Sequence, residues 1–473
     1  MHVIFLNPQG NFDPQDSHLT EHPDFGGQLV YVKEIGMALS KMGVHVDIVT
    51  RRIDDPDWPE FSKPLDYYKG YADHLRIVRI ACGGPKFLNK ERLWEYLDEF
   101  TDNILAFYGE GLPDFATGHY GDGGYSAVLL KQKAGIGFTF TGHSLGAQKL
   151  DKLGMTPENF DRMEQQYRFS KRIAAERLSI AQAFQIITST SQERMEQYAH
   201  PLYQGAVAVN DDRKLAVIPP GVNTIIFTTQ AQEGDEAIYR KLEAKIQGKP
   251  KPWIIVSSRL DEKKNHLGAV KAYVLSKELQ AKANLGIFIR GLDDPFAEIE
   301  HLPAKEQQIL RPILDLITQH TLQANVGFFN IKSQPELATT YRYFARRGSI
   351  FTLTAFYEPF GLAPIEAAAC GLAVVVTKNG GPSEIFADGS GILVDPFDAR
   401  EIAKGLLEGI DRQQYYATLG ELRVKAKYTW EKTTEGYLRV IEKGIQQHYD
   451  QDMITRELNA KERILSYLTN RRS

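Results

Sequence analysis

Short, almost wholly apolar segments recur along this chain, and helical segments lie between most of them. The first of these apolar segments, which we assign as strands, cover residues 3–6, 44–50 and 75–80. A strand that is buried on both faces reads as a continuous apolar run, and a helix must carry the chain back between two parallel strands. The alternation therefore predicts an α/β fold with doubly wound parallel sheets.

The alternation occurs in two sets, which predicts two domains. The first set runs to a strand at 185–189, and the second begins with the apolar run 253–257. The segment 223–252 between them is polar and loosely patterned, so we place a domain boundary inside it. A chain of 473 residues is long enough for two such domains.

We expect the first domain to cover residues 1–228 and the second to cover 229–445. The charged segment 446–473 is expected to be helical and to pack back on the first domain. Another long helical stretch is expected over 157–183. Ligands of doubly wound sheets bind at the carboxyl ends of the strands, so the loops that follow strands are the places to look for a site.

Charge and cysteine content exclude several classes of protein. The net charge of −4 and the pI near 6.3 argue against a nucleic-acid or membrane-surface partner. Cys82 and Cys370 lie far apart and provide neither a disulfide framework nor a metal quartet. No apolar run is long enough for a membrane span, and the first ten residues do not resemble a signal peptide. We therefore expect a cytoplasmic protein.

The stretch 354–366 reads T-A-F-Y-E-P-F-G-L-A-P-I-E and places two carboxylates, Glu358 and Glu366, eight positions apart. A strand at 349–353 precedes it, and a helix with Pro364 in its first turn follows. The N–H groups and positive dipole end of a helix favour a phosphate, and ionised carboxylates accept hydrogen bonds from sugar hydroxyls. A nucleotide-sugar has all of these features, and we predict it as the ligand.

Two basic residues, Arg259 and Lys264, follow the strand 253–257. Taken alone they read as a solvated charged turn, but beside the two glutamates they would neutralise a diphosphate leaving group without a metal. Sugar transferases that depend on a metal carry a D-x-D loop. The D-x-D strings at 55–57 and 450–452 do not follow strands of this half. We therefore predict that no cofactor is required and that no Mg²⁺ occupies the site.

Loops that follow strands in the first half of the chain also carry candidate site residues. Gly26 and Gly27 open a helix after the first strand, either as a plain tight turn or to let the backbone approach a ligand. A lone histidine is usually a core or surface residue, but the place of His143 on a glycine-flanked loop after a strand favours a site. The basic residues of this half are Lys86, Lys149, Lys171 and Arg172. Basic residues normally form a solvated face, yet at the carboxyl edge of a sheet they would suit a phosphorylated acceptor.

Long strings spread over nearly the whole chain carry a resemblance to a known family. They are P-Q-G-N-F-D-P, H-P-D-F-G-G-Q-L-V-Y-V-K, H-Y-G-D-G-G, F-T-G-H-S-L-G-A-Q-K, S-T-S-Q-E-R, V-I-P-P-G-V-N, S-S-R-L-D-E-K-K-N-H and F-Y-E-P-F-G-L-A-P-I-E-A. On these strings the chain resembles the retaining glycosyltransferases of family 4, which have the GT-B fold, two Rossmann-like domains facing a cleft. Within that family it is similar to the short bacterial sucrose-phosphate synthases.

The resemblance implies an activity in sucrose biosynthesis. Glucose is expected to pass from UDP-glucose to the anomeric hydroxyl of fructose 6-phosphate, which gives sucrose 6-phosphate and UDP with retention. The residues implied to act in catalysis are His143, Arg259, Lys264 and Glu358. Those implied to bind the donor are Gly27, Arg259, Lys264, Ile331, Glu358, Phe360, Gly361, Leu362 and Glu366. Those implied to bind the acceptor are Gly26, Gln28, Lys86, Tyr120, Ser144, Lys149 and Arg172.

The family also implies how these groups act. Glu358 holds hexose hydroxyls and Glu366 the ribose, while Arg259 and Lys264 meet the diphosphate. His143 approaches the donor hexose. The two glutamates are not a nucleophile and acid pair, because the favoured mechanism is front-face attack in which the leaving phosphate oxygen receives the acceptor's proton.

Several alternatives remain open from the sequence. Longer family members carry regulatory segments and a phosphatase-like domain, for which this chain has no room, so a separate sucrose-phosphate phosphatase is implied. Mannosylfructose-phosphate synthase, which uses GDP-mannose, and sucrose synthase, which uses free fructose, are related activities. A catalytically silent sugar-phosphate sensor and a nucleotide-sugar epimerase are the alternatives from other classes.

Overall fold

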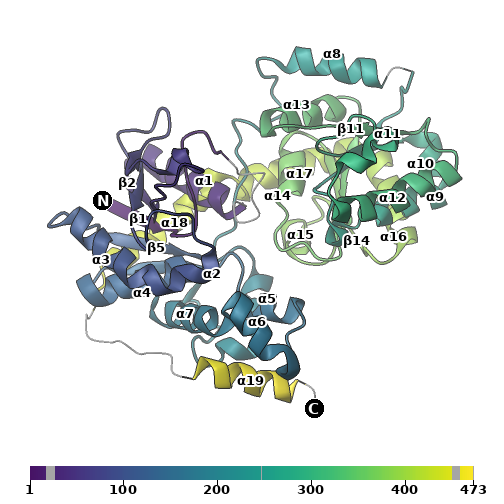
Figure 1. Cartoon of the computed structure of the whole chain (residues 1–473). Helices are drawn as coiled ribbons and strands as arrows, with labels where there is room; N and C mark the ends of the chain where they lie inside the picture. Colours follow the sequence, from purple (N-terminus) through teal and green to yellow (C-terminus); the bar gives the residue numbers. More distant parts are fainter. Residues whose placement is uncertain (18–26, 247, 450–458, 472–473) are drawn as a thin grey trace. The chain divides into compact units, whose positions relative to one another are not determined.

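The computed structural model describes residues 1–17, 27–246, 248–449 and 459–471. The chain divides into two compact units. Unit 1 consists of Met1–Pro219 with Thr433–Ser473, and unit 2 is Pro220–Lys432. Each unit contains a sheet with helices packed around it (Figure 1). The predicted α/β class with two parallel-sheet domains is confirmed.

The described part of unit 1 contains an eight-stranded sheet. Its strands, in spatial order, are β3 (Leu65–Asp66), β4 (Leu75–Ile80), β2 (His45–Arg51), β1 (His2–Leu6), β5 (Phe115–His119), β6 (Phe138–Thr141), β7 (Gln185–Thr188) and β8 (Leu215–Val217). Neighbouring strands pair in parallel, apart from the short β3, which is antiparallel to β4. The sequence analysis did not predict β3, because two residues give no readable periodicity.

The described part of unit 2 contains a six-stranded sheet in which neighbouring strands are parallel. Its strands, in spatial order, are β11 (Val326–Phe329), β10 (Asn284–Phe288), β9 (Trp253–Ser257), β12 (Ile350–Leu353), β13 (Ala373–Thr377) and β14 (Ile392–Val394). Alternate residues of β9 pack into different hydrophobic clusters, Ile254 and Val256 into one, Trp253 and Ile255 into the other. Both faces of this sheet are therefore buried, as continuous apolar strands require.

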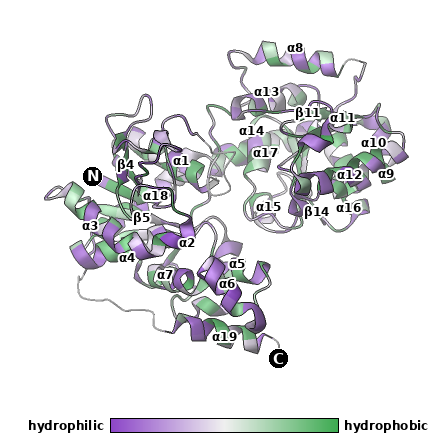
Figure 2. Cartoon of the chain, in the orientation of Figure 1, coloured by the Kyte–Doolittle hydropathy of each residue, from purple (hydrophilic) through white to green (hydrophobic). Residues whose placement is uncertain are grey.

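Helices cover both sheets. The helices of unit 1 are α1 (Gly27–Lys41), α2 (Lys90–Leu93), α3 (Leu97–Tyr108), α4 (Tyr120–Ala134), α5 (Gly146–Lys152), α6 (Phe160–Tyr167), α7 (Phe169–Gln182) and α19 (Ala460–Asn470). Those of unit 2 are α8 (Asp235–Lys245), α9 (His266–Leu275), α10 (Lys277–Lys282), α11 (Pro295–Glu298), α12 (Ala304–Gln319), α13 (Gln334–Ala345), α14 (Leu362–Ala369), α15 (Gly381–Ile385), α16 (Ala399–Asp411) and α17 (Gln413–Lys427). Helix α18 (Trp430–Ile445) begins in unit 2 and continues in unit 1. Hydrophobic and hydrophilic residues alternate along these helices, as expected for helices with one face on a core (Figure 2).

The unit boundaries lie earlier in the chain than the expected ones after residues 228 and 445. Val222 forms a bridge with Thr429, and Phe227 packs in the core of unit 2, so the segment after Pro219 already belongs to that unit. The return to unit 1 comes within α18, where Tyr437 is fully buried and its hydroxyl lies 2.8 Å from Thr141 Oγ1. Long-range contacts of this kind leave no local signal in composition.

The prediction of one continuous helix over 157–183 is wrong. The chain forms a short turn, then α6, then α7, with a break at Arg168, whose φ is +52°. Glu164 caps the new helix, since its carboxylate accepts hydrogen bonds from the N–H and hydroxyl of Ser170. Helix α19 packs on unit 1 through Ile464 and Leu468. The segment 450–458, which the sequence analysis also expected to be helical, lies outside the described residues.

The order of strands defines where ligands bind. In unit 1 the chain winds outward from β1 in one direction and from β5 in the other, and in unit 2 from β9 and β12. At such switch points the loops after the two central strands diverge and leave a crevice at the carboxyl edge of the sheet. The loops after β9 and β12 carry Arg259, Lys264 and Glu358, the residues predicted to contact the donor.

Candidate active site

The loop after β9 in unit 2 is fastened to the loop after β12. Asn265 has a left-handed backbone with φ of +52°, and its side-chain amide donates to the carbonyls of Thr354 at 3.0 Å and Pro396 at 2.9 Å. Its side-chain oxygen accepts from the N–H of Gly268 and caps α9. Asn265 is buried, so these bonds fix the backbone directly after Lys264.

Lys264 and Glu358, 94 positions apart, meet in an ion pair with Nζ 2.6 Å from Oε2. Both side chains are largely buried, with 22% and 11% of their surface exposed. A charge-assisted hydrogen bond of this kind is among the stronger polar contacts in a protein. The structure therefore brings together the cation and the carboxylate that the sequence analysis assigned to one site.

The backbone of Glu358 is held by the glycine turn before α15. The N–H of Glu358 donates to the carbonyl of Asn379 at 3.1 Å, and the N–H of Gly381 donates to the carbonyl of Glu358 at 2.8 Å. Gly380 has φ of +97°, and a Cβ there would lie 2.0 Å from the Glu358 oxygen. Only glycine fits this close approach, so the Gly380-Gly381 pair has a structural role that supports the carboxylate.

Arg259 and the start of α14 contribute positive charge to the same edge of the sheet. Arg259 is exposed and, within the described residues, its side chain has no hydrogen bond or ion pair. Gly361, with φ of +109°, precedes α14, so Phe360, Gly361 and Leu362 lie where the first N–H groups of the helix have no intrahelical partner. A helix N-terminus beside two cations is a suitable place for a diphosphate.

Glu366 lies in α14, one turn inside that helix, and is partly buried. Burial raises the pKa of its carboxyl group from 4.5 to about 7. Within the described residues no cation or hydrogen-bond donor pairs with it. A carboxylate placed in this way can accept hydrogen bonds from vicinal hydroxyls of a ligand.

The raised pKa of Glu366 predicts a pH-dependent stability. The folded state binds the proton of the Glu366 carboxyl group more tightly than the unfolded chain does. The contribution of this group to the free energy of unfolding is therefore fully present below about pH 4.5 and is lost as the pH rises through about 7. Glu366→Gln is neutral at every pH and is expected to raise the free energy of unfolding at pH 8 by about 1–3 kcal/mol. At pH 4.5 the variant and the wild type should be nearly equal. Urea unfolding at both pH values measures the difference.

The exposed Glu262 provides the control for that experiment. Glu262→Gln removes a carboxylate from the loop after β9 without removing a buried one. A stability gain that is the same at pH 4.5 and pH 8, or that Glu262→Gln reproduces, would contradict the assignment to Glu366.

Ile331 lies just after β11, at the edge of the sheet. It is partly buried and packs against the hydrophobic cluster that contains Phe329. The neighbouring backbone is fixed by side chains: Asn330 Oδ1 accepts from the N–H of Gly291, and Glu336 accepts from the N–H of Lys332. These hydrogen bonds fix the backbone on either side of Ile331.

In unit 1 the predicted acceptor residues fall into different places, and so does Gly27, which was predicted to bind the donor. Gly27 is the first residue of α1 and Gln28 lies in its first turn, in the connection that follows β1. Gly26 lies outside the described residues. Lys86 is exposed after β4, and its carbonyl accepts a hydrogen bond from Arg51.

Arg172 is buried and is the centre of a cluster that contains three of the predicted residues, with Tyr120 partly buried and Ser144 exposed. Its Nε donates to Glu176 Oε1 at 2.9 Å, and its Nη2 donates to the carbonyl of Ser144. The guanidinium carbon lies 4.5 Å from the centre of the Tyr120 ring. The negative Glu176 raises the pKa of Arg172 against the opposing effect of burial. The arginine is thus already engaged by the protein, in contrast to the free basic group that the sequence suggested.

Glu176 was not predicted as a site residue from the sequence. This fully buried carboxylate accepts hydrogen bonds from the N–H of Gly146, from Arg172 and from the hydroxyl of Tyr203. It therefore joins the start of α5 to α7 and holds the predicted loop 142–146. Its spacing of four residues from Arg172 on one helix is the signal that could have identified it.

His143 lies in this loop, and Lys149 follows it in α5. Lys149 lies in α5, and its Nζ is 4.9 Å from the centre of the Tyr167 ring. His143 is partly buried between β6 and α5 and has a left-handed backbone with φ of +55°. Such a backbone is uncommon outside glycine and asparagine and is often found in functional sites.

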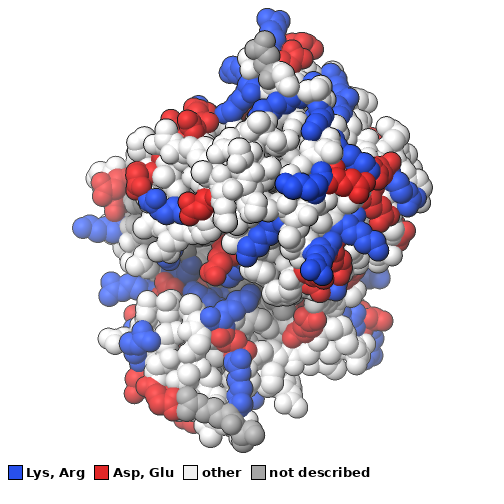
Figure 3. Space-filling model, turned by 90° about the vertical axis from the view of Figure 1, so that its right-hand side faces the viewer, with Lys and Arg blue, Asp and Glu red and all other residues white. Residues whose placement is uncertain are grey.

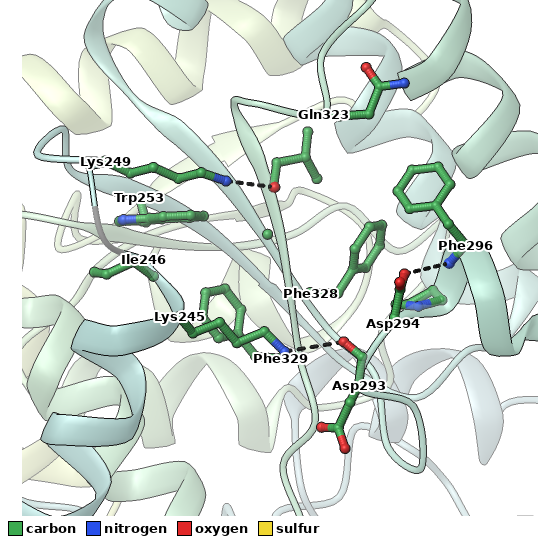
Figure 4. Close-up of a pocket in the computed structure, with 13 residues that line it drawn as sticks. Lys245, Ile246, Lys249, Trp253, Asp293, Asp294, Phe296, Gln323, Phe328 and Phe329 are labelled. Carbon is green, nitrogen blue, oxygen red and sulfur yellow. Dashed lines mark hydrogen bonds between the residues drawn. The ribbon is translucent and has the colours of Figure 1, made fainter.

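A surface patch of one charge, or a further cavity in unit 2, would indicate a second candidate site. On the face drawn in Figure 3, Lys and Arg side chains lie among Asp and Glu side chains. A cavity of about 290 Å³ lies along β11, lined by Lys245, Lys249, Phe296 and Phe328 (Figure 4). Lys245 and Lys249 donate there to the carbonyls of Asp293 and Val326. None of the residues predicted to bind the donor lines this cavity.

Two structural features are absent from the described part of the chain. No helix there is long and apolar enough to cross a membrane. No group of three or more His, Cys, Asp or Glu side chains there is arranged to hold a metal ion.

Comparison with known proteins identifies the family. A family model described as the sucrose synthase first GT-B domain matches residues 1–247, and one described as glycosyl transferases group 1 matches residues 240–426. A probable sucrose-phosphate synthase of Thermosipho melanesiensis is 46% identical over 445 residues, which cover 94% of this chain and 97% of that protein. The chain belongs to the sucrose-phosphate synthase family.

Other members and solved structures agree with this assignment. The sucrose-phosphate synthase of Zea mays is 32% identical over 93% of this chain, but the match covers 47% of the maize protein, so the chain spans about half its length. The structure of sucrose-phosphate synthase from Thermosynechococcus elongatus superposes with a TM-score of 0.67 over 94% of this chain and 98% of that one. At 23% identity that structure supports the GT-B fold of this sucrose-phosphate synthase family member.

Proposed function

We propose that this chain transfers glucose from UDP-glucose to the anomeric hydroxyl of fructose 6-phosphate, which yields sucrose 6-phosphate and UDP. The Lys264–Glu358 pair beside the start of α14, at the switch point of the second sheet, is the observation that carries the donor half of the proposal. Family membership at 46% identity supports the acceptor and the product.

The proposed chemistry assigns one task to each group of unit 2. Arg259, Lys264 and the first N–H groups of α14 balance the charge that develops on the diphosphate as the bond from C1 to the phosphate oxygen breaks. Glu358 and Glu366 accept hydrogen bonds from the hexose and ribose hydroxyls. The new bond forms between C1 and the fructose oxygen on the same face, and the fructose proton passes to the departing phosphate oxygen. The anomeric configuration is thereby retained.

Unit 1 is proposed to bind fructose 6-phosphate. The cluster of Arg172, Tyr120 and Ser144 lies at the loop after β6, and Lys149 lies one and a half turns further on in α5. Arg172 keeps guanidinium N–H groups beyond those that bind Glu176 and Ser144, since the group has five donors. These groups are proposed to bind the phosphate of the acceptor, together with Gly26, Gln28 and Lys86.

A direct assay tests this function. The purified protein is incubated with UDP-glucose and fructose 6-phosphate, and the released UDP and the sugar product are measured. No UDP release with any of UDP-glucose, ADP-glucose, GDP-glucose and GDP-mannose would reject a transferase. Faster turnover with GDP-mannose, or with free fructose, would instead favour mannosylfructose-phosphate synthase or sucrose synthase, which the comparisons do not favour.

We also propose that the reaction needs no Mg²⁺, because Arg259 and Lys264 supply the cationic charge that a metal supplies elsewhere. The expected result is that an excess of EDTA, which removes bound divalent ions, leaves kcat unchanged. A loss of activity that added Mg²⁺ restores, with UDP-glucose present throughout, would contradict this proposal.

The product keeps its 6-phosphate, so a separate phosphatase is proposed to release free sucrose. A cytoplasmic location, where the sugar phosphate and the nucleotide-sugar are both available, also stays a prediction. Fractionation of cells that express the tagged chain would test the location.

A further inference from the structure

A line of hydrogen bonds leads from the centre of the first sheet to His143. Thr117 Oγ1 lies 2.7 Å from His119 Nε2, and His119 Nδ1 lies 3.0 Å from His143 Nε2. Thr117 and His119 belong to β5, which is a central strand, and both are fully buried. The two imidazole rings are stacked, with centres 5.2 Å apart and planes at 26°. The ring of Tyr31 meets His143 edge-on, with the ring centres 4.9 Å apart.

Both histidines are neutral near pH 7. Burial, with a smaller effect from the neighbouring ring, lowers the pKa of His119 well below its usual value. Burial likewise lowers the pKa of His143 to about 3. A neutral imidazole carries one N–H and one bare nitrogen, so each ring has one proton to place.

The contacts decide where those protons lie. In one arrangement the Thr117 hydroxyl donates to His119 Nε2, and His119 Nδ1–H donates to His143 Nε2. In the reverse arrangement His119 Nε2–H donates to Thr117, whose own hydroxyl proton then needs another acceptor. Within the described residues the hydroxyl has no hydrogen-bond partner other than His119. A buried hydroxyl proton without an acceptor is disfavoured, so the first arrangement holds.

The first arrangement fixes the state of His143. Its Nε2 accepts the proton of His119, and its own proton therefore lies on Nδ1. That Nδ1 has no hydrogen-bond partner within the described residues. An N–H in this position can donate to an oxygen of a ligand, and it cannot accept a proton without breaking the line of bonds.

We infer that Thr117 and His119 are positioning residues that hold His143 as the Nδ1–H tautomer, so that it presents a fixed neutral donor to a hydroxyl oxygen of the substrate sugar. The inference rests on the proposed function for the identity of the sugar. It assigns His143 the role of hydrogen-bond donor and excludes a role as general base. The left-handed backbone of His143 needs support from its surroundings, and the bond from His119 supplies part of it.

The state of the tautomer can be read without substrate. The protein is labelled with ¹⁵N-histidine, and long-range ¹H–¹⁵N correlation spectra at pH 7 distinguish a protonated from a bare ring nitrogen. A His143→Gln variant identifies the His143 signals among those of the 12 histidines. The expected result is a protonated Nδ1 and a bare Nε2 for His143. A protonated Nε2 would overturn the inference, whatever the enzyme assay shows.

Three variants distinguish a role of Thr117 in positioning His143 from a role in packing alone. Thr117→Val removes the donor while it keeps the shape, and it is expected to give a mixture of His143 tautomers and to lower kcat by about tenfold with little change in KM. Thr117→Ser restores the hydroxyl and should restore the Nδ1–H tautomer and most of kcat. The matched control is Thr139→Val on the adjacent strand. Thr139 pairs with Thr117 in register, and its buried hydroxyl has no hydrogen-bond partner among the described residues. It should leave the tautomer and kcat unchanged.

Each outcome decides a different question. A Thr117→Val variant that loses activity while His143 keeps a pure Nδ1–H tautomer would show a merely structural role and contradict the inference. A second variant, His119→Phe, should release His143 from any single tautomer, and it applies if Thr117→Val does not fold. If the wild type releases no UDP, the proposed function fails, while the tautomer spectra still test the line of hydrogen bonds.

Discussion

Replacing Lys264 with alanine is expected to lower kcat by about 10²–10³-fold, because one preorganised charge at a developing oxyanion is worth about that much. Lys264 Nζ lies 2.6 Å from Glu358, at the edge where the diphosphate is proposed to bind. The KM for UDP-glucose should change less than kcat, since the charge on the phosphate grows as the bond breaks. Steady-state UDP release, with UDP-glucose and fructose 6-phosphate each varied in turn, measures both constants.

The adjacent Lys263 is a matched control. Its side chain is exposed, and its backbone carbonyl, which accepts from the N–H of Phe356, is retained in alanine. Lys263→Ala should therefore keep kcat within about twofold of the wild type, as expected for a surface substitution. A similar loss of activity in the two alanine variants would contradict the role of Lys264.

A double variant distinguishes two causes of the loss. Lys264→Ala leaves the largely buried Glu358 without its cation, and a stranded charge could itself disturb the site. Lys264→Ala/Glu358→Gln removes that charge as well. If the lysine acts on the diphosphate, the double variant stays inactive. Recovery of kcat in the double variant would show that the stranded carboxylate caused the loss.

The strands could be predicted from the sequence, because parallel strands buried on both faces are continuous apolar runs. The run 253–257 became β9 without change of bounds. The positions of the strands also predicted which residues bind the donor. Loops after central strands of a doubly wound sheet form the binding crevice, so Arg259, Lys264 and Glu358 could be assigned to one edge of the sheet from the sequence alone.

The contacts that hold those residues could not be predicted. Asn265 binds the carbonyls of Thr354 and Pro396, which are 89 and 131 positions away, and such pairs leave no periodic pattern. The break between α6 and α7 at Arg168 could not be predicted for a different reason. Arginine has no preference for a left-handed backbone, so tertiary contacts and the cap from Glu164 override a helical pattern.

The residues of unit 1 that are predicted to bind the acceptor also make contacts that could not be predicted from the sequence. Arg172 looks in sequence like one of several basic residues on a helix, and its partner Glu176 is an ordinary i,i+4 neighbour. The hydroxyl of Tyr203, 27 positions further on, completes the cluster. Burial then converts a pattern typical of a solvated helix face into a fixed ion pair, with 5% and 0% of the two side chains exposed.

Arg172→Ala is expected to have two effects, of which one concerns stability. It leaves Glu176 fully buried without its cation, and breaking a buried ion pair costs about 3–5 kcal/mol of unfolding free energy. The second effect is a rise in KM for fructose 6-phosphate of about 10²-fold, with far less change in KM for UDP-glucose, because a charged hydrogen bond to phosphate is lost. Urea unfolding and two-substrate kinetics measure the two effects separately.

Arg177, on the same helix α7, separates the loss of stability from the loss of acceptor binding. It is also buried, and its guanidinium donates to the carbonyls of Leu202 and Gln204. Arg177→Ala should therefore destabilise the fold by a comparable amount and leave the KM for fructose 6-phosphate unchanged. If both variants raise that KM equally, the rise follows from disturbed packing of α7, and the phosphate role of Arg172 is wrong. A rise confined to Arg172→Ala would place the acceptor phosphate beside a guanidinium that Glu176 holds in position.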